Sequence, residues 1–347
     1  MAYEKLAVFG VGAVGSIIGG YLSRAGTDIT LIDMWPAHVE EMKRHGLRIT
    51  AQDEEFTGKV QAVHLADACG LRDQFDVVFL AVKSYDSVWA AHFLQPYLKP
   101  AGVLVLAQNS INEDWVAPVI GHTRVIGCVI TMGAALYEPG HATRTTASTR
   151  PPFALGELNG MITPRVEELV KILAPVGPSH STANLWGERW AKLTVNCMAN
   201  SIAGITSMNN AEMRDNFDVF SIFVKIAGEA LAVAEMLGVQ VEPVNGIPAK
   251  AFLEASRGMG LQELHRAWVE RGKSVGAGRP SLLQDVMKSR RTEVDYLNGY
   301  VVRKGREVGV PTPTNEAIVG IAKRVETGEL KSNPANMKLL TACLQSR

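Results

Sequence analysis

The sequence predicts an α/β protein in which an N-terminal, doubly wound parallel sheet of the Rossmann type is followed by an all-helical C-terminal domain. Over about the first 130 residues, short apolar runs alternate with amphipathic stretches of helical period. A glycine-rich loop follows the first apolar run, and from about Asn184 long helical patterns replace the strands. These three features define the two predicted domains.

Buried parallel strands are expected where an apolar run is nearly unbroken, because helices cover both faces of such a strand. The runs Asp76–Val82 and Val103–Ala107 show this pattern most clearly. The segment His141–Pro152 is rich in Thr, Arg and Pro, and we expect it to be a surface connection. The other predicted elements are strands at Leu6–Phe9, Asp28–Ile32, Val125–Thr131 and Phe153–Gly156 and a first helix at Val14–Ala25.

The second predicted domain consists of long helices. The turn-forming stretch Pro175–Ala183 marks the expected boundary, which gives domains of residues 1–183 and 184–347. The helical patterns cover Trp186–Ile205, Asp218–Leu237, Ala249–Glu270, Leu282–Val308 and Thr314–Thr327.

The composition favours a globular protein that acts on a small molecule. Lys plus Arg and Asp plus Glu both number 35, so the formal net charge of zero suggests neither a nucleic acid nor an anionic membrane as partner. No apolar run reaches the roughly 18 residues of a membrane span, and the N-terminus lacks the pattern of a signal peptide. We therefore expect a cytoplasmic location.

Cysteine and histidine spacing gives no support for a metal site. The four cysteines form no CxxC pair, and the eight histidines form no HxxxH or HExxH pair. We expect reduced, buried thiols at Cys69, Cys128, Cys197 and Cys343, and no metal.

The glycine-rich loop has the GxGxxG pattern between the first strand and the first helix. In this pattern the first glycine permits a tight turn, the second lets a pyrophosphate approach the backbone, and the third lets helix and strand pack closely. The free N–H groups and the dipole at the start of the helix attract phosphates. Alone the pattern is weak, but its flanking strand and helix favour a dinucleotide site. Its residues are Gly10, Val11, Gly12, Ala13, Val14 and Gly15.

Asp33 ends the second predicted strand, 18 residues after Gly15. A carboxylate at this place accepts hydrogen bonds from the adenosine ribose and repels a 2′-phosphate, which favours NAD. Lys43 and Arg44 on the next helix could soften this repulsion. The alternative is that Asp33 is a surface turn residue that only closes the strand.

Lys83 and Asn109 follow two of the buried strands, in the sequences AVKSYD and AQNSIN. Ligands of open α/β sheets bind outside the carboxyl ends of the strands. Lys83 could therefore meet a phosphate, a ribose or the nicotinamide, and Asn109 the nicotinamide ribose or the substrate. The alternative for both is a solvated loop side chain.

Lys192, Asn196 and Asn200 are spaced four residues apart, so they share one face of a helix that is otherwise apolar. A narrow polar stripe of this kind indicates that the stripe faces a buried polar group. A structural hydrogen-bond network is one interpretation. The other is catalysis, because a buried lysine has a lowered pKa and can protonate the oxygen of a ketone as it is reduced.

Two residues near the C-terminus are further candidates. Ser281 with Gln284 matches a capping box, and the helix start that it marks would also attract a substrate carboxylate. Glu293 is predicted to lie in the middle of the same helix, where an ion pair with Arg290 is the structural alternative.

Together these motifs resemble the ketopantoate reductase (2-dehydropantoate 2-reductase) family. The resemblance runs from GVGAVGSIIGGYL through VKSYD, QNSIN and GAALYEPG. It continues in KLTVNCMANSIAGI and MNNAEMRD and ends on SLLQDVMKSRRTEVDYLNGYVVRKGREVGVPTP, and the last two long blocks are its most specific part.

The resemblance implies a Rossmann domain and a helical domain with the active site in the cleft between them, and a place in pantothenate biosynthesis. It implies Lys192 as the general acid and Glu293 as a catalytic group that assists binding and orientation. Asn196, Asn200 and Ser281 would contact the substrate, Ser281 at its carboxylate. Asn109 would lie near nicotinamide and substrate, and Lys83 near the cofactor. A homodimer is one assembly to test.

This sequence departs from the family pattern in three places. Family members commonly use NADPH and carry a basic residue where this chain has Asp33, and QNSIN replaces the usual QNG. The segment between Ala251 and Pro280 looks longer than in compact members, and Arg279 is the candidate in it to bind the substrate carboxylate. The alternative is a solvated loop with scattered positive charge. The basic residues of this segment are Arg257, His265, Arg266, Arg271, Lys273 and Arg279.

The leading hypothesis is therefore an NAD- or NADP-dependent reductase of a 2-oxo acid, with ketopantoate as the default substrate. A second hypothesis is an NAD-dependent dehydrogenase that oxidises a different hydroxy acid. A third, from another class, is a non-catalytic dinucleotide-binding regulator, which would need the glycine loop but no proton donor such as Lys192.

Overall fold

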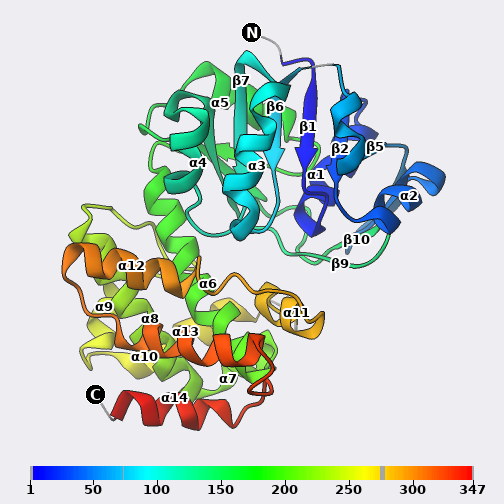
Figure 1. Cartoon of the computed structure of the whole chain (residues 1–347). Coiled ribbons are helices and arrows are strands. Elements are labelled where there is room, and N and C mark those ends of the chain that lie inside the picture. The colour runs from blue at the N-terminus through cyan, green and yellow to red at the C-terminus, as the bar shows by residue number, and fades with distance from the viewer. Residues whose placement is uncertain (1–2, 73, 274–277, 346–347) are drawn as a thin grey trace. The chain divides into compact units, whose positions relative to one another are not determined.

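The computed structural model describes residues 3–72, 74–273 and 278–345. The chain divides into two compact units, Met1–Leu185 and Trp186–Arg347 (Figure 1). The first unit is a Rossmann-type α/β domain that contains both sheets, and the second is built from helices. The predicted fold class is confirmed.

The main sheet of the first unit has eight strands in the order β12-β11-β8-β7-β6-β1-β2-β5. Neighbouring strands are parallel except β8 and β11, which are antiparallel. The strand order reverses at β1, which is the place where dinucleotide-binding sheets hold their ligand. The strands are β1 Leu6–Phe9, β2 Ile29–Asp33, β5 Gln61–His64, β6 Phe75–Leu80, β7 Leu98–Ala107, β8 Val125–Ile130, β11 Phe153–Glu157 and β12 His180–Ser181.

Helices cover both faces of this sheet, which explains why its central strands are apolar throughout. Leu6 and Val8 of β1 join the core under α1, α2 and α5, whereas Ala7 and Phe9 join the core under α3 and α4. Figure 1 shows α3 and α4 lying across one face of the sheet. These helices are α1 Ala13–Arg24, α2 Pro36–His45, α3 Ser87–Leu94, α4 Glu113–Ile120 and α5 Pro164–Ile172.

A second, four-stranded sheet in the order β4-β3-β10-β9 packs beside α1. The prediction of a surface connection over His141–Pro152 is wrong for its first four residues, because His141–Arg144 forms β10 between β3 and β9, whereas residues 145–152 form no helix or strand. Arg144 is 1% exposed and donates a hydrogen bond to the Val176 carbonyl. The strands are β3 Leu47–Thr50, β4 Glu55–Gly58, β9 Ala134–Glu138 and β10 His141–Arg144.

The second unit contains fewer long helices than the sequence predicts. The helix expected at Ala249–Glu270 is broken into α9 and α10 by Gly258 and Gly260, which have φ angles of +90° and +75°. The helix expected at Leu282–Val308 is broken into α11 and α12, and Ser289 in the intervening segment has a φ of +49°. A helix cannot continue through a left-handed residue. The helices are α6 Leu185–Thr206, α7 Asn210–Asp215, α8 Phe217–Met236, α9 Ala249–Ser256, α10 Leu261–Gly272, α11 Ser281–Met287, α12 Asn298–Val308, α13 Pro313–Glu326 and α14 Asn336–Gln345.

A buried hydrogen-bond network joins four helices of this unit. Asn298 at the start of α12 donates to the Cys197 carbonyl of α6 at 3.2 Å and to Asn315 Oδ1 of α13 at 2.9 Å, and it accepts from Ser201 of α6. Asn315 Nδ2 in turn donates to Glu229 of α8 at 2.7 Å. Since Asn298 and Asn315 are fully buried, each lost partner would leave a desolvated polar group.

Asn298→Ala should therefore lower the free energy of unfolding of the second unit by about 1–3 kcal/mol, because it leaves buried partners of α6 and α13 unsatisfied. Thermal and urea unfolding followed by circular dichroism measure this change. Gln262→Ala, at an exposed position of α10, is the matched control and should be neutral. Equal stability of the two variants would show that the network contributes nothing.

Candidate active site

The glycine loop lies between β1 and α1, at the carboxyl edge of the sheet. Gly10 has a φ of +91°, and a Cβ there would lie 2.7 Å from the Val82 nitrogen. A Cβ on Gly15 would lie 2.1 Å from the Gly10 carbonyl oxygen. A Cβ on Gly12 would meet nothing within 4 Å, so of the three glycines of this loop only Gly12 faces open space. Two glycines are thus required by packing, and the third leaves room beside the backbone.

Asp33 ends β2 beside this loop and is half-buried. Its carboxylate accepts a hydrogen bond from the Val11 N–H at 2.6 Å and another from the Trp35 N–H at 2.8 Å. Asp33 therefore does more than close a strand, because it holds the backbone of the glycine loop.

The two basic residues expected near Asp33 have acidic neighbours. Lys43 Nζ lies 3.2 Å from Glu40 and 4.0 Å from Asp67, and Arg44 lies 3.9 Å from Glu40. These acids offset the positive charge of Lys43 and Arg44. The two basic residues therefore do less to reduce the repulsion between Asp33 and a 2′-phosphate.

The turns that carry Lys83 and Asn109 follow the neighbouring strands β6 and β7 and are hydrogen-bonded to each other. Gln108 Nε2 donates to the Val82 carbonyl at 2.7 Å, directly before Lys83. Asn112 Nδ2 donates to the Asn109 carbonyl at 2.8 Å and to Ser84 Oγ at 3.3 Å. Gln108 and Asn112, which sequence reasoning missed, fix the backbone of both turns.

In the second unit, α6 carries Lys192, Asn196 and Asn200 one helical turn apart. Lys192 is half-buried, and the two asparagines are 4% and 8% exposed. Burial lowers the pKa of Lys192 from its usual 10.5. The two asparagines of the stripe are therefore buried and its lysine partly so, and Lys192 gives up a proton more easily than a surface lysine does.

Ser281 lies next to this stripe, as the first residue of α11. Its N–H and its Oγ donate to Asn200 Oδ1 at 3.0 Å and 3.3 Å. The predicted capping box is wrong, because Pro280 precedes the helix as its N-cap and Gln284 Nε2 donates to the Arg279 carbonyl instead. Ser281 is therefore hydrogen-bonded to Asn200 of α6 and not to Gln284 of its own helix.

Glu293 does not lie in the middle of a helix, so the predicted position is wrong. It lies in the segment between α11 and α12 and is 6% exposed. The neighbouring Thr292 donates through its N–H and Oγ1 to Glu326 of α13, both at 3.3 Å. The segment that carries Glu293 is therefore anchored to the helical core.

The basic residues between Ala251 and Pro280 lie in different surroundings. Arg266 of α10 pairs with Glu263, Lys273 directly after α10 pairs with Glu270, and His265 packs against Phe220. Arg279 is exposed two residues before Ser281, and its role in substrate binding stays a prediction. Residues 274–277 of this segment lie outside the described residues.

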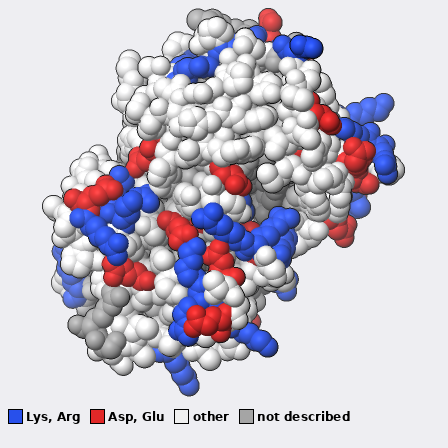
Figure 2. All heavy atoms as spheres, viewed as in Figure 1, with Lys and Arg blue, Asp and Glu red and all other residues white. Residues whose placement is uncertain are grey.

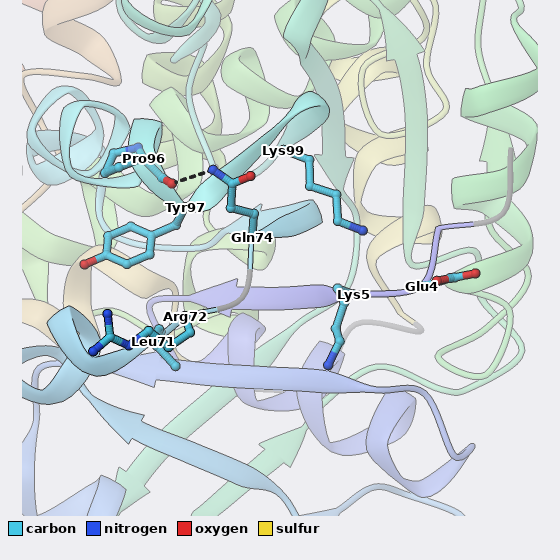
Figure 3. Close-up of a pocket in the computed structure, with 8 residues that line it drawn as sticks. All are labelled: Glu4, Lys5, Leu71, Arg72, Gln74, Pro96, Tyr97 and Lys99. Carbon is cyan, nitrogen blue, oxygen red and sulfur yellow. Dashed lines mark hydrogen bonds between the residues drawn. The ribbon is translucent and has the colours of Figure 1, made fainter.

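A surface hollow lies at the opposite, amino edge of the main sheet (Figure 3). Gln74 and Lys99 there stand at the starts of β6 and β7, and Gln74 Nε2 donates to the Pro96 carbonyl at 3.1 Å. Because ligands of open α/β sheets bind at the carboxyl edge, this hollow is not the expected site. Its lining residues are Glu4, Lys5, Leu71, Arg72, Gln74, Pro96, Tyr97 and Lys99.

The described residues contain no group of three or more His, Cys, Asp or Glu side chains suited to a metal ion.

Of the helices that the structure describes, none combines the length and apolarity that a bilayer span requires. Acidic and basic side chains are interspersed on the visible face of the second unit (Figure 2).

Comparison with known proteins gives relatives along nearly the whole chain. The curated 2-dehydropantoate 2-reductase of Archaeoglobus fulgidus is 26% identical, and the match covers 94% of this chain and 100% of that protein. The curated 2-dehydropantoate 2-reductase of Mesorhizobium japonicum is 29% identical, and the match covers 92% of this chain and 97% of that protein. A ketopantoate reductase structure from Ralstonia eutropha aligns with a TM-score of 0.77 at 26% identity, over 94% of this chain and 99% of its own. D-mandelate dehydrogenase with NADH and anilino(oxo)acetate has a TM-score of 0.79 at 23% identity, over 93% and 99%.

Two family models divide the chain between them. The model for ketopantoate reductase PanE/ApbA matches residues 6–160, and the model for its C-terminal region matches residues 184–326. With the Rossmann unit, the helical unit and the full-length relatives in agreement, the chain belongs to the ketopantoate reductase family of oxidoreductases.

Proposed function

We propose that this protein reduces a 2-oxo acid with NADH or NADPH, and that ketopantoate, reduced to pantoate, is its default substrate. The observation that carries the proposal is the buried stripe of α6, where Lys192 with a lowered pKa is aligned with Asn196 and Asn200. The curated relatives named 2-dehydropantoate 2-reductase support this choice of substrate.

The glycine loop fits a dinucleotide. Gly12 leaves open space beside the backbone, and no side chain of the described residues caps the start of α1. The N–H groups there are suited to a diphosphate. Gly10–Gly15 would hold the diphosphate, Asp33 the adenosine ribose, and Lys83 and Asn109 the remainder of the cofactor. When bound, the nicotinamide supplies a hydride to the substrate.

Reduction places a new C–H bond on the carbonyl carbon and leaves negative charge on the oxygen. Lys192 Nζ gives that oxygen a proton, and the neutral amine takes a proton back from water before the next turnover. Asn196 and Asn200 hold the substrate without changing its charge, and Ser281 and Arg279 bind its carboxylate. Glu293 assists the binding and orientation of the substrate.

One observation favours a second candidate, an NAD-dependent dehydrogenase that oxidises another hydroxy acid. Asp33 places a carboxylate beside the loop, where the phosphate of NADP would be repelled. In this direction neutral Lys192 would accept the proton of the hydroxyl group. A purely regulatory dinucleotide-binding protein would need no lysine with a lowered pKa.

Gly12→Ala should weaken NADH binding while leaving the thermal stability unchanged, because the new methyl group enters the open space that the diphosphate needs. Gly15→Ala should lower the melting temperature, since its Cβ would collide with the Gly10 carbonyl. Fluorescence titration and thermal unfolding of both variants separate the two effects. Unchanged NADH affinity in Gly12→Ala would place the diphosphate elsewhere.

Lys192→Ala should lower kcat about 10²–10⁴-fold while NADH still binds, because the proton donor is lost. In the wild type, the rate of reduction should fall as the pH rises through the pKa of Lys192, which burial places below 10.5. The rate of oxidation should rise over the same range, since the neutral amine is then the active form.

Steady-state rates in both directions across pH measure these changes, and Lys225→Ala, at an exposed position of α8, is the matched control. Near-wild-type kcat in Lys192→Ala would make Lys192 a structural residue.

NADH should serve at least as well as NADPH, because the Asp33 carboxylate accepts the ribose hydroxyls and repels a 2′-phosphate. Asp33→Arg should shift the ratio of kcat/KM values towards NADPH. It should also weaken both cofactors, since the hydrogen bonds to the Val11 and Trp35 N–H groups are lost. A wild-type kcat/KM clearly higher with NADPH contradicts this role of Asp33.

A further inference from the structure

The Val11 residue of the glycine loop is held on both of its peptide groups. Its N–H donates to Asp33 Oδ2 at 2.6 Å, and its carbonyl accepts from Ser16 Oγ at 3.0 Å. Ser16 lies in the first turns of α1 and is fully buried. The cofactor contacts proposed above give no role to Ser16.

His38 of α2 is the second buried partner of Ser16. Its Nδ1 accepts a hydrogen bond from the Gly140 N–H at 2.8 Å, and its Nε2 lies 3.4 Å from Ser16 Oγ. Because Nδ1 is the acceptor, the proton of the neutral ring is on Nε2, where it points at Ser16. Burial lowers the pKa of His38 and so favours this neutral form.

The hydrogen bonds therefore run in one direction. The Gly140 N–H donates to His38, His38 Nε2 donates to Ser16, and the Ser16 hydroxyl donates to the Val11 carbonyl. Gly140 lies in the turn between β9 and β10, and its own carbonyl accepts from the Arg48 N–H at 2.8 Å. The small sheet and α2 thus anchor a hydroxyl group at the glycine loop.

This anchor fixes the direction of the Gly12 N–H. The described chain contains no cis peptide bond, so the Val11 carbonyl and the Gly12 N–H point in opposite directions. With the carbonyl held by Ser16, the N–H points away from Ser16. Gly12 tolerates many φ angles, so this peptide group could otherwise turn over at little cost. A reversed group would present a carbonyl oxygen, which repels a phosphate, in place of a donor.

We propose that Ser16 and His38 are positioning residues that hold the Val11–Gly12 peptide group in the orientation that binds the diphosphate of the dinucleotide. The inference rests on the dinucleotide-binding part of the proposed function. Neither side chain touches the cofactor in this account. The two act through the direction of one peptide group.

The test uses the full-length protein without substrate. Ser16→Ala removes the donor to the Val11 carbonyl and should raise the Kd for NADH about tenfold. Amide hydrogen exchange of the cofactor-free protein should show faster exchange at the glycine loop. Ser23→Ala is the matched control, because Ser23 is also on α1 but donates to the Lys59 carbonyl, away from the loop.

Two substitutions of His38 separate its contacts. Asn can still accept from the Gly140 N–H but does not reach Ser16, whereas the longer Gln can reach Ser16. His38→Asn should therefore weaken NADH binding as Ser16→Ala does, and His38→Gln should restore most of the affinity. This pair also decides the question if Ser16→Ala fails to fold.

Equal Kd values for wild type, Ser16→Ala and His38→Asn would overturn the inference, as would a loss of affinity that only follows a fall in melting temperature. A stronger effect of Gln than of Asn at position 38 would also overturn it. If the wild-type protein does not bind NADH at all, the proposed function fails instead.

Discussion

The close approach of the glycine loop to the sheet is the constraint on which the first unit depends. Gly10 and Gly15 pack so tightly against Val82 and against each other that a single methyl group would collide with backbone atoms. This packing puts the start of α1 at the carboxyl edge of the sheet, next to the turns that carry Lys83 and Asn109. Asp33 then fastens the loop through the Val11 N–H. The dinucleotide site is in this sense a consequence of backbone packing.

The second unit depends on polar groups that are buried but hydrogen-bonded. Asn200 accepts from Ser281, and Asn298 links α6 to α12 and α13. A buried polar group without a partner is costly, so these contacts help to hold α11, α12 and α13 in place relative to α6. Lys192 is carried by the same helix, and burial lowers its pKa. Burial thus has two effects on α6. It requires hydrogen-bond partners for the buried asparagines, and it lowers the pKa of the lysine that we propose as the proton donor.

The sequence predicts the central part of the fold well because its signals there are local and strong. The strand Leu6–Phe9 is confirmed residue for residue, and the first helix is confirmed to within one residue at each end. The prediction misses the small sheet, because its strands lack an unbroken apolar run: β3 reads LRIT and β10 reads HATR. In addition, β10 pairs with β3, about 90 residues away in the sequence, and local patterns do not show such pairing. Two helices were predicted too long, because a left-handed residue such as Ser289 carries no periodic signal.

Some residues of the candidate site can be identified from the sequence, and others cannot. Residues with a chemical signature, such as Asp33 and Lys192, could be singled out from the sequence, although their roles stay predictions. His38 and Gln108 could not, because their importance comes from contacts with backbone atoms of distant segments. Ser16 could not, because its role depends on the direction of the Val11 carbonyl and on the contact with His38. The placement of Glu293 failed for a related reason, since the end of α11 is set by backbone conformation rather than by side-chain pattern.

The central claim is that this chain transfers a hydride from a nicotinamide dinucleotide to a 2-oxo acid. The most direct test incubates the purified protein with NADH or NADPH and a panel of 2-oxo acids that includes ketopantoate, and follows the absorbance of the reduced nicotinamide. The account predicts consumption of the reduced dinucleotide with at least one 2-oxo acid, one equivalent of 2-hydroxy acid formed for each dinucleotide oxidised, and no consumption with the matching acid that lacks the oxo group. A protein that binds the dinucleotide but oxidises it with no member of the panel would contradict the account.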